Sequence, residues 1–320
     1  MGGYDSSLAM KELKDTVIIC NPRAGGGQAK KRWEKFYSQL QEKGITVNFS
    51  FTLYLGHAVK LAKEALLSGY RRIAVFGGDG TFNEVIQGVI RDDELVNPDL
   101  VLTFLCAGSS CDFDNLFKIK KSLIERLLSN DVIKIDLCRV RCRGFKGKNV
   151  VRYFVVNSST GVISHAIAEF NRSTRFINFL KKISVDLGAI VSGIRALASF
   201  GTFNGTLSFD NNESEWSLKN ATVFKSSYFG GGMNYGLSSK ADDGVLHVAT
   251  IDAVNSVRLF LLIPSLYTGR ILKKKPAKYH KCKSFKIDSR QDIFVETDGE
   301  IIGYLPAEYN ILPRKLPISL

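Results

Sequence analysis

The chain has 320 residues, and Lys and Arg outnumber Asp and Glu by 44 to 31, which gives a formal net charge of +13. This length is enough for one large hydrophobic core or two modest ones, and two are more usual. No apolar run approaches the roughly 18 residues that a transmembrane helix needs, and the first residues lack a signal-peptide pattern, so membrane contact is expected to be peripheral. The basic excess predicts an anionic partner, such as nucleic acid, a phosphorylated metabolite or an acidic bilayer.

The first third of the chain alternates between strand and helix patterns. The strand patterns are short apolar runs, and the helix patterns are amphipathic segments. In chain order these segments are residues 16–20, 28–43, 45–51, 56–69, 71–76, 81–90 and 100–105. This rhythm predicts an N-terminal three-layer α/β domain, in which helices cover both faces of a parallel sheet.

After about residue 130 the chain changes to many short strands rich in β-branched and aromatic residues. Hairpin signals separate them, such as "DDG" at 242–244 and "TDGE" at 297–300, and this pattern predicts an antiparallel β-sandwich as a second domain. Residues 173–199 have helical spacing and a broad apolar face, so we expect inserted helices there. The predicted fold class is therefore α/β plus β, with the domain boundary between residues 131 and 136.

Six cysteines are spread over the chain without any CxxC pair. This spacing favours reduced thiols in a cytoplasmic protein over a disulfide framework. The four histidines have no Cys or His neighbour at metal-ligand spacing, so none is a candidate zinc ligand. No helix-turn-helix, RNP or zinc-finger pattern appears either, and we therefore expect no nucleic-acid partner despite the positive charge.

Three loops rich in small residues follow predicted strands: "NPRAGGG" (21–27), "GGDGT" (77–81) and "AGSSCDF" (107–113). In a parallel sheet such loops share the edge at the carboxyl ends of the strands, where ligands bind. Gly77 and Gly78 lack a Cβ and would let the backbone approach a polyphosphate. Asp79 has the wrong charge for direct contact with phosphate, so its position predicts a Mg²⁺ ion between them, unless the loop is only a tight turn.

Five motifs, in this order, resemble those of the soluble diacylglycerol kinase and sphingosine kinase superfamily of lipid kinases. They are "NPRAGGG", "TLYLGHA" (52–58), "GGDGTFNEV" (77–85), "AGSSCDF" and the late "DGE" (298–300). Together they extend over nearly the whole chain. The resemblance implies that residues 1–133 form a nucleotide-binding α/β domain to which residues 306–320 return, and that residues 134–305 form a β-sandwich that receives the lipid acceptor.

The same resemblance implies ATP and Mg²⁺ as cofactors. The residues implied to surround ATP are Asn21, Pro22, Arg23, Gly25, Thr52, Gly77, Gly78, Asp79, Gly80, Thr81, Asn83, Glu84 and Ser109. Acceptor recognition is implied near Asp112. Here Cys111 replaces an Asn that is common in the family, and a thiol cannot reproduce the hydrogen bonds of an amide, which leaves acceptor recognition and full activity in question.

A second departure from the family concerns "SSKADDGVLHV" (238–248). In bacterial relatives this turn binds a structural Mg²⁺, which implies Asp243 and the backbone carbonyls of Lys240 and Val245 as ligands here. Some relatives supply another aspartate where this chain has Lys240, whose ammonium would repel the ion. As an alternative, "DDG" is a good hairpin turn that needs no metal.

Transfer of a phosphoryl group to an alcohol needs a carboxylate near the attacking hydroxyl. The "TDGE" corner provides Asp298 and Glu300, which would share a face if they lay on one strand. The resemblance makes one of these two the proton acceptor, with Asp79 as a further candidate for that role. An isolated "DGE" is otherwise an ordinary turn.

We therefore expect an ATP-dependent lipid kinase that is cytoplasmic, peripheral at an anionic membrane surface, and acts on diacylglycerol or a sphingoid base. The basic run at 270–283 would favour such a surface, with a solvated basic strand as the alternative. The apolar face at 173–199 would line an acyl channel unless it packs in a core. The rival functions are an NAD kinase and a non-catalytic lipid- or nucleotide-binding protein. The sequence leaves the oligomeric state open, with a homodimer as one option.

Overall fold

The computed structural model divides the chain into two compact units. Unit 1 contains residues 11–111, Ile119–Lys134 and Leu316–Leu320, and unit 2 contains Ile135–Lys315 together with a short segment that begins at Asp112. The residues that the structure describes are 11–117, 119–171, 191, 193, 195–210, 212–237 and 239–320.

The chain returns to unit 1 at Leu316, ten residues later than the predicted position 306. The reason is the hydrogen bonding of the preceding segment, because residues 307–310 pair with a strand of unit 2. The segment that begins at Asp112, which the sequence assigned to the nucleotide-binding domain, likewise belongs to unit 2.

Unit 1 is built on parallel strands. β1 (Lys11–Cys20) pairs with β2 (Ile45–Phe51) on one side and with β3 (Arg72–Gly77) on the other, and β3 pairs with β6 (Val101–Cys106). The last residues of the chain add a further parallel strand beside β6. β3 and β6 are almost entirely buried apolar runs, as expected for strands covered on both faces. The carboxyl ends of all these strands therefore lie at one edge of the sheet.

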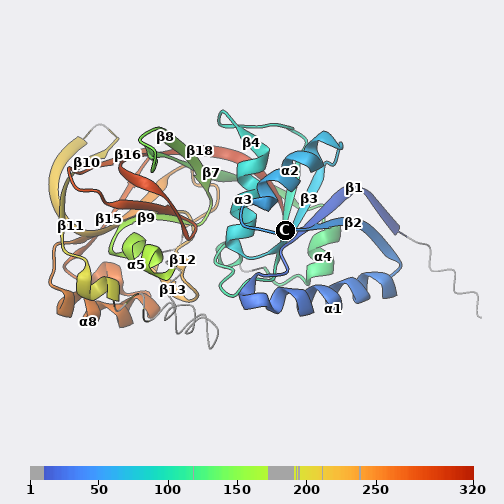
Figure 1. The fold of residues 1–320 in the computed structure, drawn as a ribbon, viewed down its shortest axis with the longest axis horizontal. Coiled ribbons are helices and arrows are strands. Elements are labelled where there is room, and N and C mark those ends of the chain that lie inside the picture. Colours follow the sequence, from blue (N-terminus) through green and yellow to red (C-terminus); the bar gives the residue numbers. More distant parts are fainter. Residues whose placement is uncertain are drawn as a thin grey trace, which may run out of the picture. The chain divides into compact units, whose positions relative to one another are not determined.

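Helices cover both faces of this sheet, as Figure 1 shows. α1 (Gln28–Glu42) and α4 (Leu123–Leu128) share an apolar cluster with one face, while α2 (His57–Leu67) and α3 (Asp79–Val89) pack against each other on the opposite face. α1 forms because a stripe at helical spacing can be buried there. Its buried residues are Ala29, Trp33, Phe36 and Leu40.

Unit 2 consists mainly of antiparallel strands, with β7 entering it from unit 1 and β18 returning to unit 1. Its elements are η2 (Asp114–Leu116), β7 (Val132–Arg143), β8 (Asn149–Phe154), β9 (Asn157–Gly161), α5 (Val162–Asn171), β10 (Phe203–Phe209), β11 (Asn212–Phe224), β12 (Tyr228–Phe229), β13 (Met233–Asn234), β14 (Leu246–Asp252), α8 (Ser256–Tyr267), η3 (Ile271–Lys273), β15 (Ala277–Cys282), β16 (Ser284–Asp288), β17 (Phe294–Thr297) and β18 (Glu300–Ser319). Unit 1 contains in addition η1 (Gly25–Gly27) and the hairpin of β4 (Ile90–Arg91) and β5 (Glu94–Leu95).

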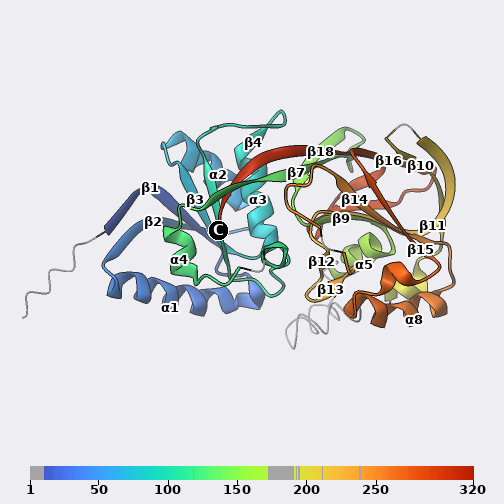
Figure 2. The same ribbon diagram turned by 180° about the vertical axis from the view of Figure 1, so that it is seen from behind.

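Six strands of unit 2 form a closed circuit of antiparallel pairs. Figure 2 shows β9, β10, β11, β16 and β18 of this circuit. In order these strands are β10, β11, β9, β17, β18 and β16, and β16 pairs back to β10. The sequence predicted two packed sheets, and the hydrogen bonds instead close the sheet on itself. This is because β11 and β18 are long and change partners along their length, so each belongs to two parts of the circuit.

Helix α5 follows the circuit strand β9 and packs against β9 and β17. The helical region predicted at 173–199 lies mostly outside the described residues, and of that region residues 195–199 are helical. Within the ranges that the structure describes, no helix is both long enough and apolar enough to cross a bilayer.

Candidate active site

The loop after β1 is tied to the loop after β3. The Asn21 backbone N–H donates to the carbonyl of Phe76 at 2.9 Å, and its side-chain Nδ2 donates to Oγ1 of Thr81 at 2.9 Å. The Asn21 Oδ1 in turn accepts the backbone N–H of Arg23 at 3.0 Å. Asn21 thus fixes two of the three predicted nucleotide loops to each other, which is a physical reason for an Asn at this position.

Glycines let the backbones of these loops approach closely. A Cβ added to Gly108 would lie 2.6 Å from the Gly78 Cα, and one added to Gly77 would lie 2.8 Å from the Thr81 side chain. Gly25 has φ +58°, and a Cβ there would meet the Ala107 carbonyl at 3.2 Å. The third loop therefore approaches the other two through main chain, at Gly78 and Gly25. Such a surface of backbone amides suits a polyphosphate, so the residues present fit ATP.

Asp79 is the first residue of α3, two residues before the predicted start of this helix. The helix begins early because Gly78 is extended and acts as its N-cap. An acidic residue in the first turn is favoured by the helix dipole, which by itself accounts for a carboxylate at this position. Asp79 is half-buried, so it also remains a candidate for binding Mg²⁺.

Glu84 holds the turn before α2. Its Oε1 accepts the backbone N–H of Gly56 at 2.9 Å and its Oε2 accepts that of Ala58 at 3.1 Å. Both oxygens therefore bind protein amides, and the structure indicates a positioning role for Glu84 rather than contact with ATP. α2 begins at His57, one residue after the predicted start of this helix, and the His57 Nδ1 accepts the N–H of Leu53 at 3.1 Å.

The other residues predicted around ATP differ in exposure. Thr52 and Asn83 are buried. The backbone N–H of Thr52 donates to the carbonyl of Cys20 at 2.8 Å. The exposed positions are Arg23, Gly80 and Ser109, and Pro22 is half-buried. All of these residues belong to unit 1, as do the first two glycine loops and residues 107–111 of the third. Asp112, the predicted acceptor residue, belongs to unit 2, where it is buried and its carbonyl accepts Oγ of Ser226 at 3.0 Å.

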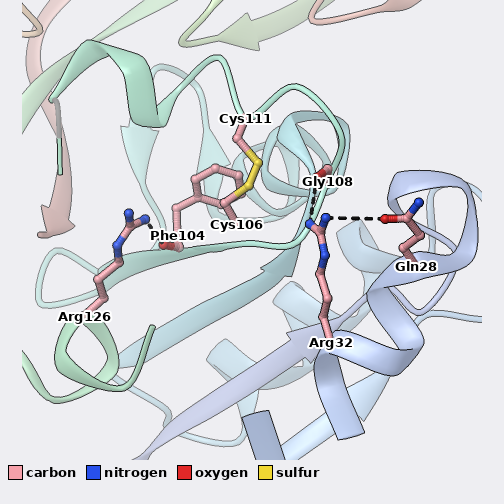
Figure 3. The surroundings of a disulfide bond; sticks show 7 residues. All are labelled: Gln28, Arg32, Phe104, Cys106, Gly108, Cys111 and Arg126. Atoms are coloured by element: carbon pink, nitrogen blue, oxygen red, sulfur yellow. Dashed lines mark hydrogen bonds between the residues drawn. A yellow bond between two sulfur atoms is a disulfide. The ribbon is translucent and has the colours of Figure 1, made fainter. Parts of the chain in front are cut away.

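Cys106 and Cys111 form a disulfide across the loop that follows β6 (Figure 3). The prediction of reduced thiols is wrong for this pair, because the loop turns back and brings the two Cα atoms to 6.0 Å. Cys111 has φ +52°, and Arg32 of α1 holds the same loop by donating to the Gly108 carbonyl at 3.1 Å. Cys111, at the position where the resemblance implied an Asn, therefore forms a covalent link within this loop.

The other four cysteines are free and buried: Cys20, Cys138, Cys142 and Cys282. Burial raises the pKa of the Cys20 thiol to about 12 and that of Cys142 to about 11. Both thiols therefore stay protonated near neutral pH and are unreactive.

The "TDGE" corner of unit 2 is a two-residue hairpin between β17 and β18. Thr297 pairs with Glu300, and both loop residues, Asp298 and Gly299, have positive φ. The two carboxylates therefore do not share a strand face, contrary to what two positions on one strand would give. Asp298 is half-buried, whereas Glu300 is exposed.

Asp298 is held by β9. Its backbone N–H donates to the Asn157 carbonyl at 2.9 Å, and its Oδ1 accepts the Asn157 N–H at 2.9 Å. Behind it lies Glu296, which is 1% exposed and whose Oε2 accepts the Gly299 N–H at 3.0 Å. Burial, together with the nearby Asp298, raises the pKa of Glu296 to about 8 against the lowering effect of the Gly299 hydrogen bond. Glu296 is therefore mostly neutral near pH 7.

The predicted metal turn has contacts that do not suit a divalent ion. Oδ2 of Asp243 accepts Nε2 of His247 at 2.8 Å and the backbone N–H of Lys240 at 3.4 Å, while Oδ1 accepts Nζ of Lys225 at 2.5 Å. The Val245 carbonyl also accepts Nζ of Lys225, at 3.2 Å. Burial raises the pKa of Asp243, but the hydrogen bonds from His247 and Lys225 outweigh it and hold this pKa below its usual range. In the described ranges no group of three His, Cys, Asp or Glu could hold a metal.

The sequence did not indicate the residues that support the "TDGE" corner, Asn157 and Glu296. It also did not indicate Asp136 and Lys225, which contact the turn of Asp243. A run of buried polar residues, "NSST" at 157–160, is the one signal that could have indicated a functional strand, because such runs are rare in a sheet interior. Lys225 gave no signal, since its partner Asp136 is 89 residues away.

Two family models match the chain. The model described as "Diacylglycerol kinase catalytic domain" matches residues 15–140, and that described as "YegS C-terminal NAD kinase beta sandwich-like domain" matches residues 161–320. A "Putative lipid kinase" of Streptococcus pneumoniae serotype 4 is 24% identical over 314 aligned residues, and the alignment covers 96% of this chain and 98% of the relative. A "Diacylglycerol kinase" of Staphylococcus aureus (strain MRSA252) is 23% identical, and the alignment covers 95% of this chain and 92% of that protein.

The fold also resembles a solved structure described as "A putative diacylglycerol kinase from Bacillus anthracis str. Sterne". The TM-score is 0.70 at 20% identity, covering 95% of this chain and 96% of that one. This likeness extends over both units, so the two-unit architecture is one that the Bacillus anthracis protein shares.

Proposed function

Because this chain belongs to the diacylglycerol-kinase-like superfamily of lipid kinases, we propose that it transfers the γ-phosphoryl group of ATP to the hydroxyl of a lipid, diacylglycerol or a sphingoid base. The observation that carries the proposal is the meeting of the three glycine loops at the carboxyl edge of the unit 1 sheet. Asn21 bonds to Thr81 there, and Gly78 lies against Gly108.

In this proposal unit 1 binds the nucleotide. The main chain of the glycine loops and the first turn of α3 provide N–H groups for phosphate oxygens. Mg²⁺, when bound with ATP, neutralises the charge that develops on the phosphates, and Asp79 is the carboxylate of these loops that would hold it. Glu84 keeps the turn before α2 in place through its two backbone hydrogen bonds.

In the same proposal Asp298 of unit 2 accepts the proton of the lipid hydroxyl. The hydroxyl oxygen forms a bond to the γ-phosphorus, the bond from that phosphorus to the bridging oxygen breaks, and ADP leaves with the electron pair. Asp298 suits this role better than Glu300 because it is held at a fixed position by Asn157, whereas Glu300 is exposed. The neutral Glu296 beside it adds no negative charge next to Asp298.

The test is a transfer assay with purified protein, Mg²⁺ and γ-labelled ATP, offered separately diacylglycerol, sphingosine, ceramide and NAD. We expect label in an organic-phase product with diacylglycerol or sphingosine. Label in NADP would instead support an NAD kinase, an alternative to which the name of the C-terminal family model points. Absence of label in every product would support a non-catalytic binding protein.

A surface of unit 2 supports work at a membrane. Helix α8 exposes one apolar stripe, in which the exposed fractions are 70% for Val257, 55% for Phe260, 70% for Leu261 and 57% for Tyr267. Their spacing places them on one side of the helix. Exposed basic residues flank this stripe: Arg258, Arg270, Lys273, Lys274 and Lys275. Apolar side chains bordered by positive charge fit an anionic bilayer better than a second protein surface.

We expect the double substitution Phe260→Asp/Leu261→Asp to weaken binding to vesicles of phosphatidylcholine and phosphatidylglycerol by about 10-fold or more, because each side chain loses its apolar burial. Sedimentation of vesicles at varied salt measures this, and turnover of a short-chain, water-soluble acceptor should be retained. Leu67→Asp, at an 88% exposed leucine of α2, is the matched control. Equal binding by the α8 variant and the control would contradict a role for α8.

A further inference from the structure

A buried ammonium lies in unit 2 where the family resemblance predicted a divalent cation. Lys225 directly follows β11, and its side chain is 1% exposed. Its Nζ donates to Oδ2 of Asp136 at 2.9 Å, to Oδ1 of Asp243 at 2.5 Å and to the Val245 carbonyl at 3.2 Å. An ammonium has three donors, and all three have an acceptor here. Asp243 and the Val245 carbonyl are two of the three ligands predicted for the ion.

The carboxylates of this cluster use their remaining acceptor capacity on protein donors. Asp136, with a side chain that is 0% exposed, accepts the backbone N–H groups of Gly244 at 2.7 Å and Arg314 at 3.0 Å. Asp243 accepts the side chain of His247 at 2.8 Å and the N–H of Val245 at 3.3 Å. Asp243 also accepts the backbone N–H of Lys240, at 3.4 Å.

These contacts leave no place for a divalent ion beside the lysine. Mg²⁺ must approach its oxygen ligands to about 2.1 Å. The ammonium already lies at hydrogen-bond distance from the same oxygens, and the two cations would repel each other strongly in a buried site. The donor set therefore fits the Lys225 ammonium and does not fit a metal ion in addition to it.

The cluster joins three segments of unit 2 that are far apart in the sequence. Asp136 lies on β7, Lys225 lies after β11, and Asp243 lies in the turn before β14. We propose that Lys225 is a built-in structural cation that replaces a divalent metal ion at this turn, so that the fold of unit 2 requires no metal there. A lysine cannot dissociate as a bound ion can. The link between these three segments is therefore independent of the metal concentration.

The decisive measurement uses the wild-type protein without nucleotide. Thermal unfolding in EDTA and in millimolar Mg²⁺ should give the same Tm within about 1 °C, because a ligand that does not bind the folded state cannot shift it. Isothermal calorimetry with Mg²⁺ alone should likewise show no saturable binding at this turn. A Tm that falls in EDTA and recovers with Mg²⁺ would overturn the proposal.

The variant Lys225→Asn removes the charge and leaves two buried carboxylates without a cation. We expect its Tm in EDTA to fall by about 6–20 °C, as breaking a buried ion pair costs several kcal/mol in a unit of this size. Millimolar Mg²⁺ should restore at least half of this loss, because Asp136, Asp243 and the Val245 carbonyl then become available as ligands.

The matched control is Lys219→Asn. Lys219 is a lysine of the neighbouring strand β11 and is equally buried, but its Nζ donates to the carbonyl of Phe200. This variant should lose stability without any response to Mg²⁺. A Lys225→Asn protein as stable as wild type, or one whose Tm ignores Mg²⁺, would contradict the proposal. If Lys225→Asn does not fold, the wild-type measurement still decides.

Discussion

Replacing Asp298 by Asn is expected to lower kcat for the lipid acceptor by about 10²- to 10⁴-fold, the usual contribution of a general base. An amide cannot accept the proton of the hydroxyl at neutral pH. It does keep an oxygen for the Asn157 N–H, which Asp298 now accepts at 2.9 Å. Asn also tolerates the positive φ of 44° at this position, so the turn is preserved. The measurement is initial-rate kinetics with labelled ATP.

The comparison that makes this result specific is Glu300→Gln at the other end of the same turn. Glu300 is exposed and lies at the first position of β18, so its amide variant should keep at least about half of the activity, as expected for a surface substitution. Both variants should unfold within about 2 °C of wild type. A folded Asp298→Asn enzyme with wild-type kcat would remove the proton-acceptor role from Asp298 and return it to Glu300 or Asp79.

The nucleotide loops were predictable because their positions follow from strand order alone. Once the strands before Asn21, Gly77 and Ala107 are recognised as parallel, their carboxyl ends must share an edge. The glycines then indicate where the backbones of neighbouring loops approach each other. The sequence pattern does not indicate which side chains hold the loops together. The role of Glu84 as a clamp on Gly56 and Ala58 depends on packing between α2 and α3, which sequence spacing does not encode.

Unit 2 was less predictable because its features depend on pairings between distant residues. A strand pattern predicts that β11 and β18 are strands, but their length and their successive partners decide that six strands close into a circuit. The cluster of Asp136 and Lys225 is also non-local, and the metal prediction followed the turn "ADDG" without the lysine that lies opposite it. The disulfide between Cys106 and Cys111 was also not predictable from spacing, although the two residues are close in sequence. It depends on how the loop turns, including the positive φ of Cys111.

Glu296 links the stability of unit 2 to pH, and the sign of this link follows from its environment. Its pKa in the folded protein is raised from 4.5 to about 8, mainly by burial. The stabilisation from a protonated Glu296 is therefore fully present below about pH 4.5. It decreases as the pH rises, because the unfolded chain releases the proton first, and it is lost once the pH passes about 8. Over that window the slope is on the order of 1 kcal/mol per pH unit.

The variant Glu296→Gln should remove this pH dependence. Gln is neutral at every pH and keeps an oxygen for the Gly299 N–H, so at pH 5 its free energy of unfolding should be close to that of wild type. At pH 8 the variant should be the more stable protein, because the wild type has by then lost most of the stabilisation that a protonated Glu296 provides. Denaturant unfolding at pH 5, 6.5 and 8 measures both curves, with the exposed Glu300→Gln as the control that should follow wild type. Parallel curves for wild type and Glu296→Gln over this range would mean that Glu296 is ionised in the folded protein at neutral pH, and that it adds a negative charge next to Asp298.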